Sequence, residues 1–432
     1  QYTLNPNRSA LNTDNDYAYG KGKAYPDSQA GIPFSILRNS GTINITGNYG
    51  VAGIMMNKNN QSGSRNDYLL VNDGTIIGEY IDSNSKQHIG LAFEGNTTPG
   101  TKGERYILGN DGIMEFRAPQ SAAFNFGGVN LLKYQIVYNR NTINMYGSNS
   151  FGIKMANSSL NGYTPGTDQT NTKILLESPI NIYGDNSVGV YYSAANMKAE
   201  NSVFKVNIGT GKNNYSGNIS GNDPNYVENS VGMYITPRNN NTTGTITNIV
   251  NYDIKFGDYA KNSIMFVNDG SSNSYNMSSG AFTSPLLRET YIDNSAVTSV
   301  NVEAGTNNIV FSNKGGIKNV SYAYILIIYI KPDINIGTAE KAVDNTLALY
   351  NLGAIAHLNG NIETYGEYSH GIYNSAAALT SGGVVYSVGS KLDNIIDGNA
   401  KTLSIVTHGD NSAVLYNNES NMAVNFGFIQ HI

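Results

Sequence analysis

The chain has 432 residues and a formal net charge of −5, and only 14% of its residues are charged. This small negative charge, with no block of basic residues, argues against binding to nucleic acid and against electrostatic binding to a membrane. The chain contains no cysteine, which excludes a disulfide framework, a thiol nucleophile and a cysteine-ligated zinc site.

Residues 1–40 form the first of two parts that the sequence indicates. They contain Pro6, Pro26 and Pro33 and lack the repeated phrase that fills the rest of the chain. We expect this segment to cap one end of a stacked structure, because an uncovered sheet edge pairs readily with other chains. The second part, residues 41–432, consists of repeats.

The repeated phrase joins two short β-rich runs through a glycine and a few polar residues. It is clearest at residues 141–157 (NTINMYGSNSFGIKMAN) and 179–192 (PINIYGDNSVGVYY). Seven further copies occupy residues 41–57, 74–95, 218–236, 253–269, 333–351, 361–374 and 403–418. Self-similarity at such a period is typical of a solenoid.

The glycine after the first run recurs at a steady interval. Gly147, Gly184, Gly221 and Gly257 are separated by 37, 37 and 36 residues. Two longer intervals each leave room for one degenerate unit, for which residues 111–128 and 301–316 are the candidates. The chain therefore holds about eleven units.

The runs alternate apolar and polar residues with a period of two, which predicts strands and almost no helix. Glycine, Asn and Asp between the runs supply the positive φ angles of sharp corners. A single unit cannot bury its own apolar face, so the units must stack. The sequence thus predicts an all-β, right-handed parallel β-helix of about ten to eleven rungs with loops projecting from one edge.

The alternation also predicts the direction of individual side chains. Ile143, Met145 and Ile182 should point into the core, and Asn144 should point outward. Asparagines at equivalent positions of neighbouring units should form ladders in which each amide bonds the next.

Tyrosine is abundant, with 31 residues. Tyr183, Tyr191, Tyr192 and Tyr234 recur at motif positions, where a packing role is expected because tyrosine fits a pleated face and stacks on its neighbour. The alternative is an exposed aromatic surface that stacks on glycans.

Insertions follow the second run of most units. They span residues 57–67, 95–105, 157–172, 193–201, 237–244, 269–290 and 375–392. Loops at one point of every rung project from one edge of the rod, where binding is expected. The candidate contacts, chosen as tyrosine and arginine within or near these loops, are Arg65, Tyr163, Tyr215, Arg238, Tyr275 and Arg288. The alternative is that these loops are spacers.

No motif predicts catalysis. The chain has no nucleophile turn of the GDSG or GxSxG type, its five histidines are scattered, and no HExxH pair is present. The acidic residues Asp14 and Asp16 lie close enough to suggest calcium, but no GGxGxD repeat accompanies them. We therefore predict no catalytic residue, no metal and no cofactor.

The phrases INMYGSNSFGIKM and INIYGDNSVGVYY resemble the passenger region of large fusobacterial autotransporter adhesins of the monomeric type V class, over roughly residues 41–418. The resemblance implies an extracellular, monomeric virulence factor on the bacterial surface that binds a protein or glycan receptor on host cells or partner bacteria. It also implies anchoring in the outer membrane by a C-terminal β-barrel that these residues do not include.

Two other functions remain open. A β-helix enzyme that degrades polysaccharides would show acidic and basic side chains converging over one groove. A stalk that only holds a distal head would be smooth and poor in loops. Exposed aromatics among the loops would favour the adhesin.

Overall fold

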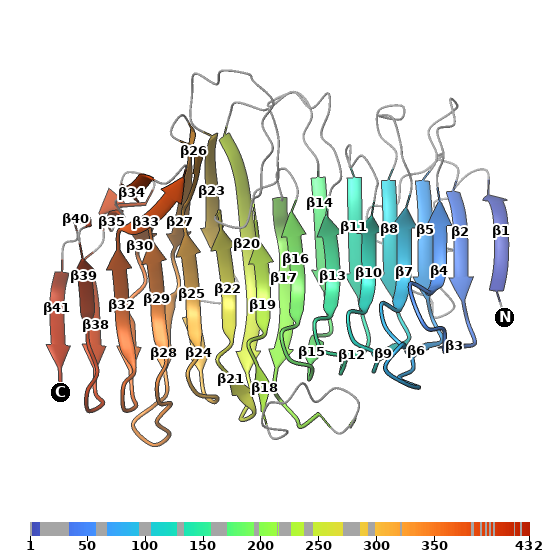
Figure 1. Ribbon diagram of the computed structural model, residues 1–432, viewed down its shortest axis with the longest axis horizontal. Helices are drawn as coiled ribbons and strands as arrows, with labels where there is room; N and C mark the ends of the chain where they lie inside the picture. Colours follow the sequence, from blue (N-terminus) through green and yellow to red (C-terminus); the bar gives the residue numbers. More distant parts are fainter. Residues whose placement is uncertain are drawn as a thin grey trace.

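The computed structural model is a parallel β-helix, which confirms the predicted architecture (Figure 1). All regular elements of the described part of the chain are β-strands, and no described helix could cross a membrane. The structure describes residues 2–8, 34–57, 67–94, 105–127, 134–156, 171–193, 198–213, 215, 226–236, 245–270, 286–292, 299–319, 322–381, 384–388, 391–393, 395–396, 399–400, 402–418, 420–423 and 426–432.

Each rung runs over three faces, numbered here in chain order, and neighbouring rungs pair in parallel. The strands on face 1 are β2 (Phe34–Asn39), β5 (Asp67–Asn72), β8 (Arg105–Asn110), β11 (Tyr134–Asn139), β14 (Asn171–Leu176), β23 (Leu286–Ile292), β27 (Tyr322–Ile330), β30 (Ile355–Leu358), β35 (Lys391–Asp393) and β40 (Asn421–Ala423). Two long strands, β17 (Lys198–Ile208) and β20 (Thr245–Phe256), cross from face 1 to face 2.

Faces 2 and 3 complete the rungs. The remaining strands of face 2 are β3 (Thr42–Ile45), β6 (Thr75–Gly78), β9 (Ile113–Phe116), β12 (Ile143–Met145), β15 (Ile180–Ile182), β24 (Ser299–Val302), β28 (Asp333–Ile336), β31 (Ile362–Thr364), β38 (Leu403–Thr407) and β41 (Phe426–His431). Face 3 holds β4 (Ala52–Asn57), β7 (Ile89–Glu94), β10 (Ala122–Gly127), β13 (Phe151–Ala156), β16 (Val188–Ser193), β19 (Val231–Ile235), β22 (Ile264–Asp269), β25 (Ile309–Lys314), β29 (Leu347–Leu352), β32 (His370–Ser375) and β39 (Leu415–Asn418). These 11 paired strands agree with the predicted number of units.

A few short strands lie outside the regular pairing of the three faces. β1 (Tyr2–Arg8) pairs antiparallel with β2 at the outer edge of face 1. β18 (Val227–Glu228) pairs with β21 (Ala260–Lys261) at the corner between faces 2 and 3. The other pairs are antiparallel: β26 (Gly316–Asn319) with β27, β33 (Ala377–Ser381) with β34 (Val384–Val388), and β36 (Ile395–Ile396) with β37 (Asn399–Ala400).

One continuous hydrophobic core fills the inside of the coil. Ile143, Met145 and Ile182 are fully buried in it, as predicted, and Asn144 lies outside. The registers stack Ile143 on Ile180 and Met145 on Ile182, so like side chains contact like side chains along the axis. Both degenerate units complete this stack, because they contribute β9, β10 and β25 in register with their neighbours.

The outer side of face 1 carries a second, separate apolar cluster. Leu69, Val71, Ile107, Ile136 and Tyr138 alternate with core residues along their strands, yet all five are buried. The alternation predicted polar side chains on the outside of each strand, but on these strands of face 1 the outward side chains are apolar.

The corner between faces 2 and 3 explains the repeated sequence. Asn149 and Asn186 adopt left-handed backbone angles, φ 56° and 53°, which asparagine tolerates better than most residues. The preceding glycine is required for another reason, close packing, since a Cβ atom on Gly184 would lie 2.3 Å from the carbonyl oxygen of Gly147. Asparagine, and not this glycine, makes the turn.

The serine after that asparagine satisfies the buried backbone of the neighbouring rung. The Ser150 N–H donates to Ser187 Oγ at 3.0 Å, and the Ser187 hydroxyl donates to the Gly147 carbonyl at 3.2 Å. The same N–H to side-chain bond recurs along the corner at His88–Ser121, Ser121–Ser150, Ser187–Ser230, Ser230–Ser263, Ser263–Asn308, Thr346–Ser369 and Ser369–Ser412. The serine is therefore a structural residue.

Asparagine ladders run along two other corners, as the sequence predicted. One joins Asn39, Asn72, Asn110 and Asn139, and a second joins Asn268, Asn313, Asn351, Asn374 and Asn417, with amide-to-amide distances of 2.6–2.9 Å. A third ladder, Asn144–Asn181–Asn207, lies outside face 2. The bonds pair the buried amides of the first two ladders, except for the Asn268 side-chain oxygen at the start of the second, and so reduce the penalty of burying them.

Most predicted insertions lie outside the described residues, and each connects a strand of face 3 with the next strand of face 1. Several of the predicted ranges were too long. The largest overlaps are at residues 269–290, which include the start of β23, and at residues 193–201, which include the start of β17, while residues 375–392 contain the pair β33–β34. The adjacent apolar residues Leu286 and Leu287 belong to strand β23 and not to a loop.

We predict that Ile182→Asp destabilises the protein by several kcal/mol, because it places an unpaired carboxylate at a site with no solvent exposure. Urea unfolding followed by circular dichroism measures the change. The control Asn44→Asp, at an exposed outward position of the same face, should alter the unfolding free energy by no more than about 0.5 kcal/mol. Equal effects of the two substitutions would contradict the assigned register.

We also predict that Ser187→Ala lowers stability by about 1–3 kcal/mol, because the buried Ser150 N–H loses its acceptor. Ser178→Ala is the matched control, since at Ser178 only the backbone makes the recorded bonds. The same unfolding experiment serves both variants. Indistinguishable midpoints would show that water replaces the hydroxyl.

Candidate binding surfaces

A group of aromatic and charged side chains gathers on the outer side of face 2. Arg117, Tyr146 and Tyr183 each follow an inward residue at the end of β9, β12 and β15, so the alternation of the strands places them outside on three consecutive rungs. Tyr215 and Glu115 complete the group, here called the tyrosine–arginine cluster.

The rings of this cluster are mutually packed. Tyr146 and Tyr183 stack with ring centres 4.9 Å apart, and Tyr215 meets Tyr146 edge-on at 4.5 Å. The Arg117 guanidinium lies over the Tyr215 ring, 4.7 Å from its centre. The cluster thus combines two ring geometries that aromatic pairs favour with a cation–π contact.

Asn213 holds Tyr215 in place. The Tyr215 N–H donates to Asn213 Oδ1 at 3.1 Å, while the Asn213 amide donates to the Tyr146 carbonyl at 2.9 Å. Through these two bonds the segment that contains Asn213 and Tyr215 is attached to the end of β12, although the two lie far apart in the sequence. The Tyr215 hydroxyl then donates to Glu115 Oε1 at 2.8 Å.

The positive charge of the cluster lies between two carboxylates. Arg117 pairs with both Glu79 and Glu115, each at 2.6 Å. Burial raises the pKa of Tyr146 to about 12, and the Glu115 charge adds to the effect. Burial and the hydrogen bond to Glu115 also raise the pKa of Tyr215, so both phenols are neutral at physiological pH.

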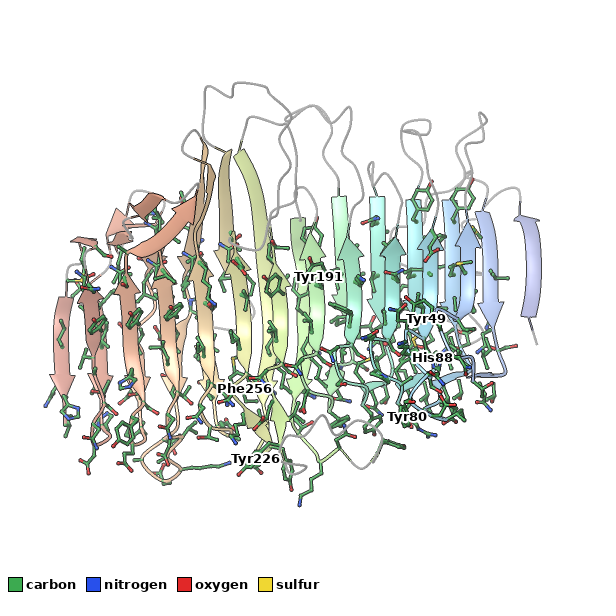
Figure 2. All side chains as sticks on the ribbon, in the orientation of Figure 1. Tyr49, Tyr80, His88, Tyr191, Tyr226 and Phe256 are labelled. Atoms are coloured by element: carbon green, nitrogen blue, oxygen red, sulfur yellow. The ribbon has the colours of Figure 1, made fainter. Side chains whose placement is uncertain are left out.

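Columns of tyrosine also lie on the outer side of face 3. Tyr350, Tyr373 and Tyr416 stack with ring centres 5.1 and 4.8 Å apart, and Tyr416 is 48% exposed. Tyr191, labelled in Figure 2, stacks on Tyr234 at 5.6 Å. Since Tyr191 and Tyr234 occupy equivalent positions of successive rungs, the packing role predicted for these two residues is confirmed.

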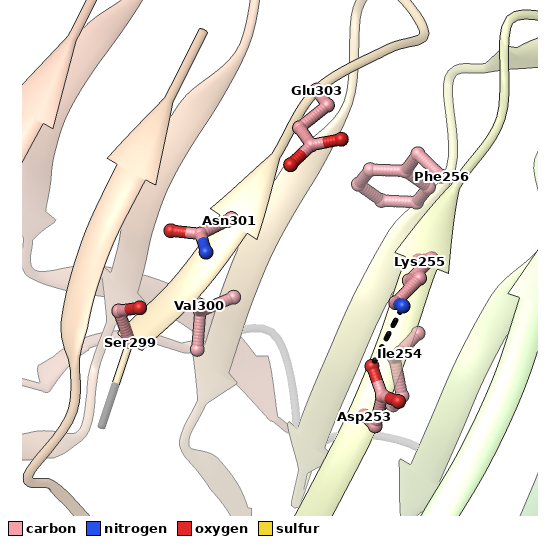
Figure 3. Close-up of a pocket in the computed structure, with 8 residues that line it drawn as sticks. All are labelled: Asp253, Ile254, Lys255, Phe256, Ser299, Val300, Asn301 and Glu303. Atoms are coloured by element: carbon pink, nitrogen blue, oxygen red, sulfur yellow. Dashed lines mark ion pairs between the residues drawn. The ribbon is translucent and has the colours of Figure 1, made fainter. Parts of the chain in front are cut away.

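A cavity of about 350 Å³ interrupts face 2 between β20 and β24 (Figure 3). It is lined by Asp253, Ile254, Lys255, Phe256, Ser299, Val300, Asn301 and Glu303. Lys255 Nζ lies 3.6 Å from Asp253 Oδ1 at its mouth. Its volume falls in the range of small-ligand sites.

Two of the six predicted contact residues lie in the described part of the chain, and neither is on the insertion-bearing corner. Tyr215 belongs to the tyrosine–arginine cluster on face 2. Arg288 lies within β23, opposite Ile246 and Leu326. The other four predicted contacts, Arg65, Tyr163, Arg238 and Tyr275, lie outside the described residues.

Sequence reasoning missed the partners of Tyr215. Tyr146 and Tyr183 occupy the same motif position, INMY and INIY, and this repetition was the available signal. Arg117 lies in a degenerate unit, where the weak match hid its equivalence to Tyr146. No described group of three or more His, Asp or Glu residues is placed to hold a metal ion, and residues 14–16 lie outside the described part.

Comparison with protein-family models, with curated proteins and with solved structures found no match for this chain.

We predict that Glu115→Gln lowers the pKa of Tyr215 but leaves it above the usual tyrosine value, because burial persists while the carboxylate charge is removed. Carbon-13 NMR of ring-labelled tyrosine across a pH titration measures it, with Tyr215→Phe identifying the resonance. Glu303→Gln, far from the cluster in sequence and rung, serves as the control. An unchanged Tyr215 titration in Glu115→Gln would show that the hydroxyl does not bond this carboxylate.

Proposed function

We propose that this chain is the receptor-binding passenger segment of a bacterial cell-surface adhesin, extracellular and monomeric, without enzymatic activity, metal or cofactor. The observation that carries the proposal is the tyrosine–arginine cluster, an ordered group of aromatic rings and hydrogen-bonding side chains on the outside of a rigid rod. The resemblance of the repeated phrases to autotransporter passengers supports the same function.

The composition of the cluster suits recognition. Tyrosine and arginine are the residues that most often dominate binding energy at protein surfaces. The stacked pair Tyr146–Tyr183 offers ring area at little cost in conformational entropy, because each ring is already held by its neighbour. Arg117 and Glu115 add donors and acceptors beside the rings. A surface glycan or a protein loop with polar groups fits this chemistry.

The carboxylates of the cluster do not favour the enzyme alternative. Glu79 and Glu115 both accept bonds from the same guanidinium, an arrangement typical of a structural ion pair. A glycoside-cleaving pair needs one carboxyl that donates a proton and a second that acts independently. The cluster also does not form a smooth surface of the kind a pure stalk would present.

An array of glycans and host and bacterial surface proteins, probed with the whole 432-residue chain, tests the proposal. We predict that the double variant Tyr183→Ala and Tyr215→Ala reduces binding to the strongest receptor by at least about tenfold, as expected for loss of two hot-spot side chains. The matched control is Tyr350→Ala and Tyr373→Ala, which removes a stacked pair from face 3.

Three outcomes decide between the alternatives. Selective loss in the face 2 variant supports the cluster as the receptor site. Equal binding by both variants and the unsubstituted chain moves recognition to another part of the surface. An array with no receptor at all favours the stalk.

A further inference from the structure

Three tyrosines form a column on the outer side of face 3, near the C-terminal end. Tyr350 of β29, Tyr373 of β32 and Tyr416 of β39 lie directly opposite one another in the register of these neighbouring strands (Figure 1). Their ring centres are 5.1 and 4.8 Å apart, and the ring planes are inclined by only 12° and 9°. Because paired strands are themselves about 4.8 Å apart, the backbone holds each ring beside the next.

The hydroxyl groups of this column are not tied to other side chains. Among the described residues, no hydrogen bond joins the hydroxyl of Tyr350, Tyr373 or Tyr416 to another group. By contrast, the Tyr234 hydroxyl on the same face donates to Asp269 Oδ2 at 2.5 Å. The rings of the column are therefore held by stacking alone and can turn about their Cβ–Cγ bonds.

Such a turn brings reactive carbon atoms together. A quarter turn of two stacked rings converts the stack into an edge-to-edge row along the axis of the rod. In that row a Cε atom of Tyr373 faces a Cε atom of Tyr416, and Cε is the ring carbon ortho to the hydroxyl. Tyr416 is 48% exposed, so its ring has room to turn, and exposed side chains reorient rapidly.

Exposure sets the order in which the column is oxidised. Tyr416 is the exposed end, and Tyr373 lies one rung behind it. Burial raises the pKa of Tyr350, and the charge of Tyr373 adds to the effect, so Tyr350 forms less of the easily oxidised phenolate. An oxidant in solution therefore reaches the pair Tyr373–Tyr416 first.

We propose that Tyr373 and Tyr416 are a site of oxidative cross-linking, at which a peroxidase acting with hydrogen peroxide joins the two rings as dityrosine. This inference concerns a covalent modification on face 3. It does not rest on the proposed adhesin function or on the tyrosine–arginine cluster.

The reaction balances without any further reactant. Each phenol gives up one electron and one proton, and the two phenoxyl radicals couple by forming a carbon–carbon bond between their Cε atoms. Each of these Cε atoms then loses its hydrogen as a proton, and each phenolic oxygen takes up a proton, so both rings are phenols again. In sum the protein loses two hydrogen atoms, whose electrons and protons reduce one hydrogen peroxide molecule to two molecules of water.

The cross-link would join β32 to β39 and enclose residues 373–416. The chain has no cysteine, so a disulfide cannot join these rungs. A covalent bond between distant residues stabilises a fold mainly by restricting the unfolded chain. The modified protein should therefore resist separation of its C-terminal rungs better than the unmodified protein.

The other tyrosine stacks are less suited to this reaction. Tyr146 and Tyr183 have ring centres 4.9 Å apart, but Tyr215 packs edge-on against Tyr146 and opposes the turn of its ring. Tyr191 and Tyr234 are farther apart, at 5.6 Å, and the bond to Asp269 holds the Tyr234 hydroxyl.

Tyr49, labelled in Figure 2, separates exposure from stacking. It is 65% exposed, more than Tyr416, and Lys86 lies over its ring. No tyrosine stacks on Tyr49 among the residues that the structure describes. It provides a matched control, because it is oxidised readily if exposure alone decides but has no described ring with which to couple.

The test treats the whole chain, in dilute solution, with a peroxidase and a limiting amount of hydrogen peroxide. Mass spectrometry of the digested product should find the peptides that contain Tyr373 and Tyr416 joined, with a mass two hydrogen atoms below their sum. Tyr416→Phe and Tyr373→Phe should each abolish this product, because phenylalanine has no phenolic hydrogen to lose. Tyr49→Phe should leave its yield unchanged.

A second measurement examines the consequence of the bond. The cross-linked chain should keep the mass of a single chain in a denaturing gel and unfold at a higher urea concentration than the untreated chain. Circular dichroism of the variants before oxidation confirms that they are folded.

Several results would overturn the proposal. They are absence of the Tyr373–Tyr416 product, its persistence in Tyr416→Phe, its loss in Tyr49→Phe, or cross-links that form only between separate chains. A product confined to Tyr146 and Tyr183 would show that ring distance decides and exposure does not. If one phenylalanine variant fails to fold, the mass analysis of the unsubstituted chain still decides.

Discussion

The structure depends on one constraint: a buried backbone group at a corner of the coil can reach a partner only on its own rung or on an adjacent one. Each rung therefore carries a side chain that serves its neighbour, such as Ser187, which accepts from Ser150 and donates to Gly147. Leaving such a group unpaired costs about 1–3 kcal/mol, and the coil has many corners. The Asn-Ser pair recurs in the sequence because the buried backbone of each corner needs the serine of the adjacent rung. The same repetition of rungs places apolar side chains in a regular stack.

Much of the coil could be predicted from the sequence because a local pattern and its repetition determine it. Alternation in INMY and INIY fixes which side chains point inward, and the spacing of Gly147 and Gly184 fixes how rungs superimpose. The assembly of the tyrosine–arginine cluster was beyond such reasoning, although the shared motif position of Tyr146 and Tyr183 was visible in the sequence. Tyr215 bonds Glu115, 100 residues earlier in the chain, and that contact depends on how a connecting segment returns across three rungs.

The interruption of face 2 has a similar origin. Residues 301–316 matched the repeat weakly, and they belong to the rung that leaves a cavity beside β20. A weak match to the repeat shows that a rung departs from the regular geometry, but it does not show where. Here the departure is the larger number of residues between Ile292 and Ser299, which can be recognised only when the registers of the neighbouring rungs are known.

The asparagine ladders give the rod a direction. From Asn39 to Asn139 every amide donates toward the next rung, as it does from Asn268 to Asn417, whereas the outer ladder through Asn181 donates toward the previous one. Reversing one amide would set two N–H groups against each other on one side and two oxygens on the other. All amides of one ladder must therefore share the same orientation. The orientation of the amide on one rung is in this way coupled to that of amides on rungs it does not contact.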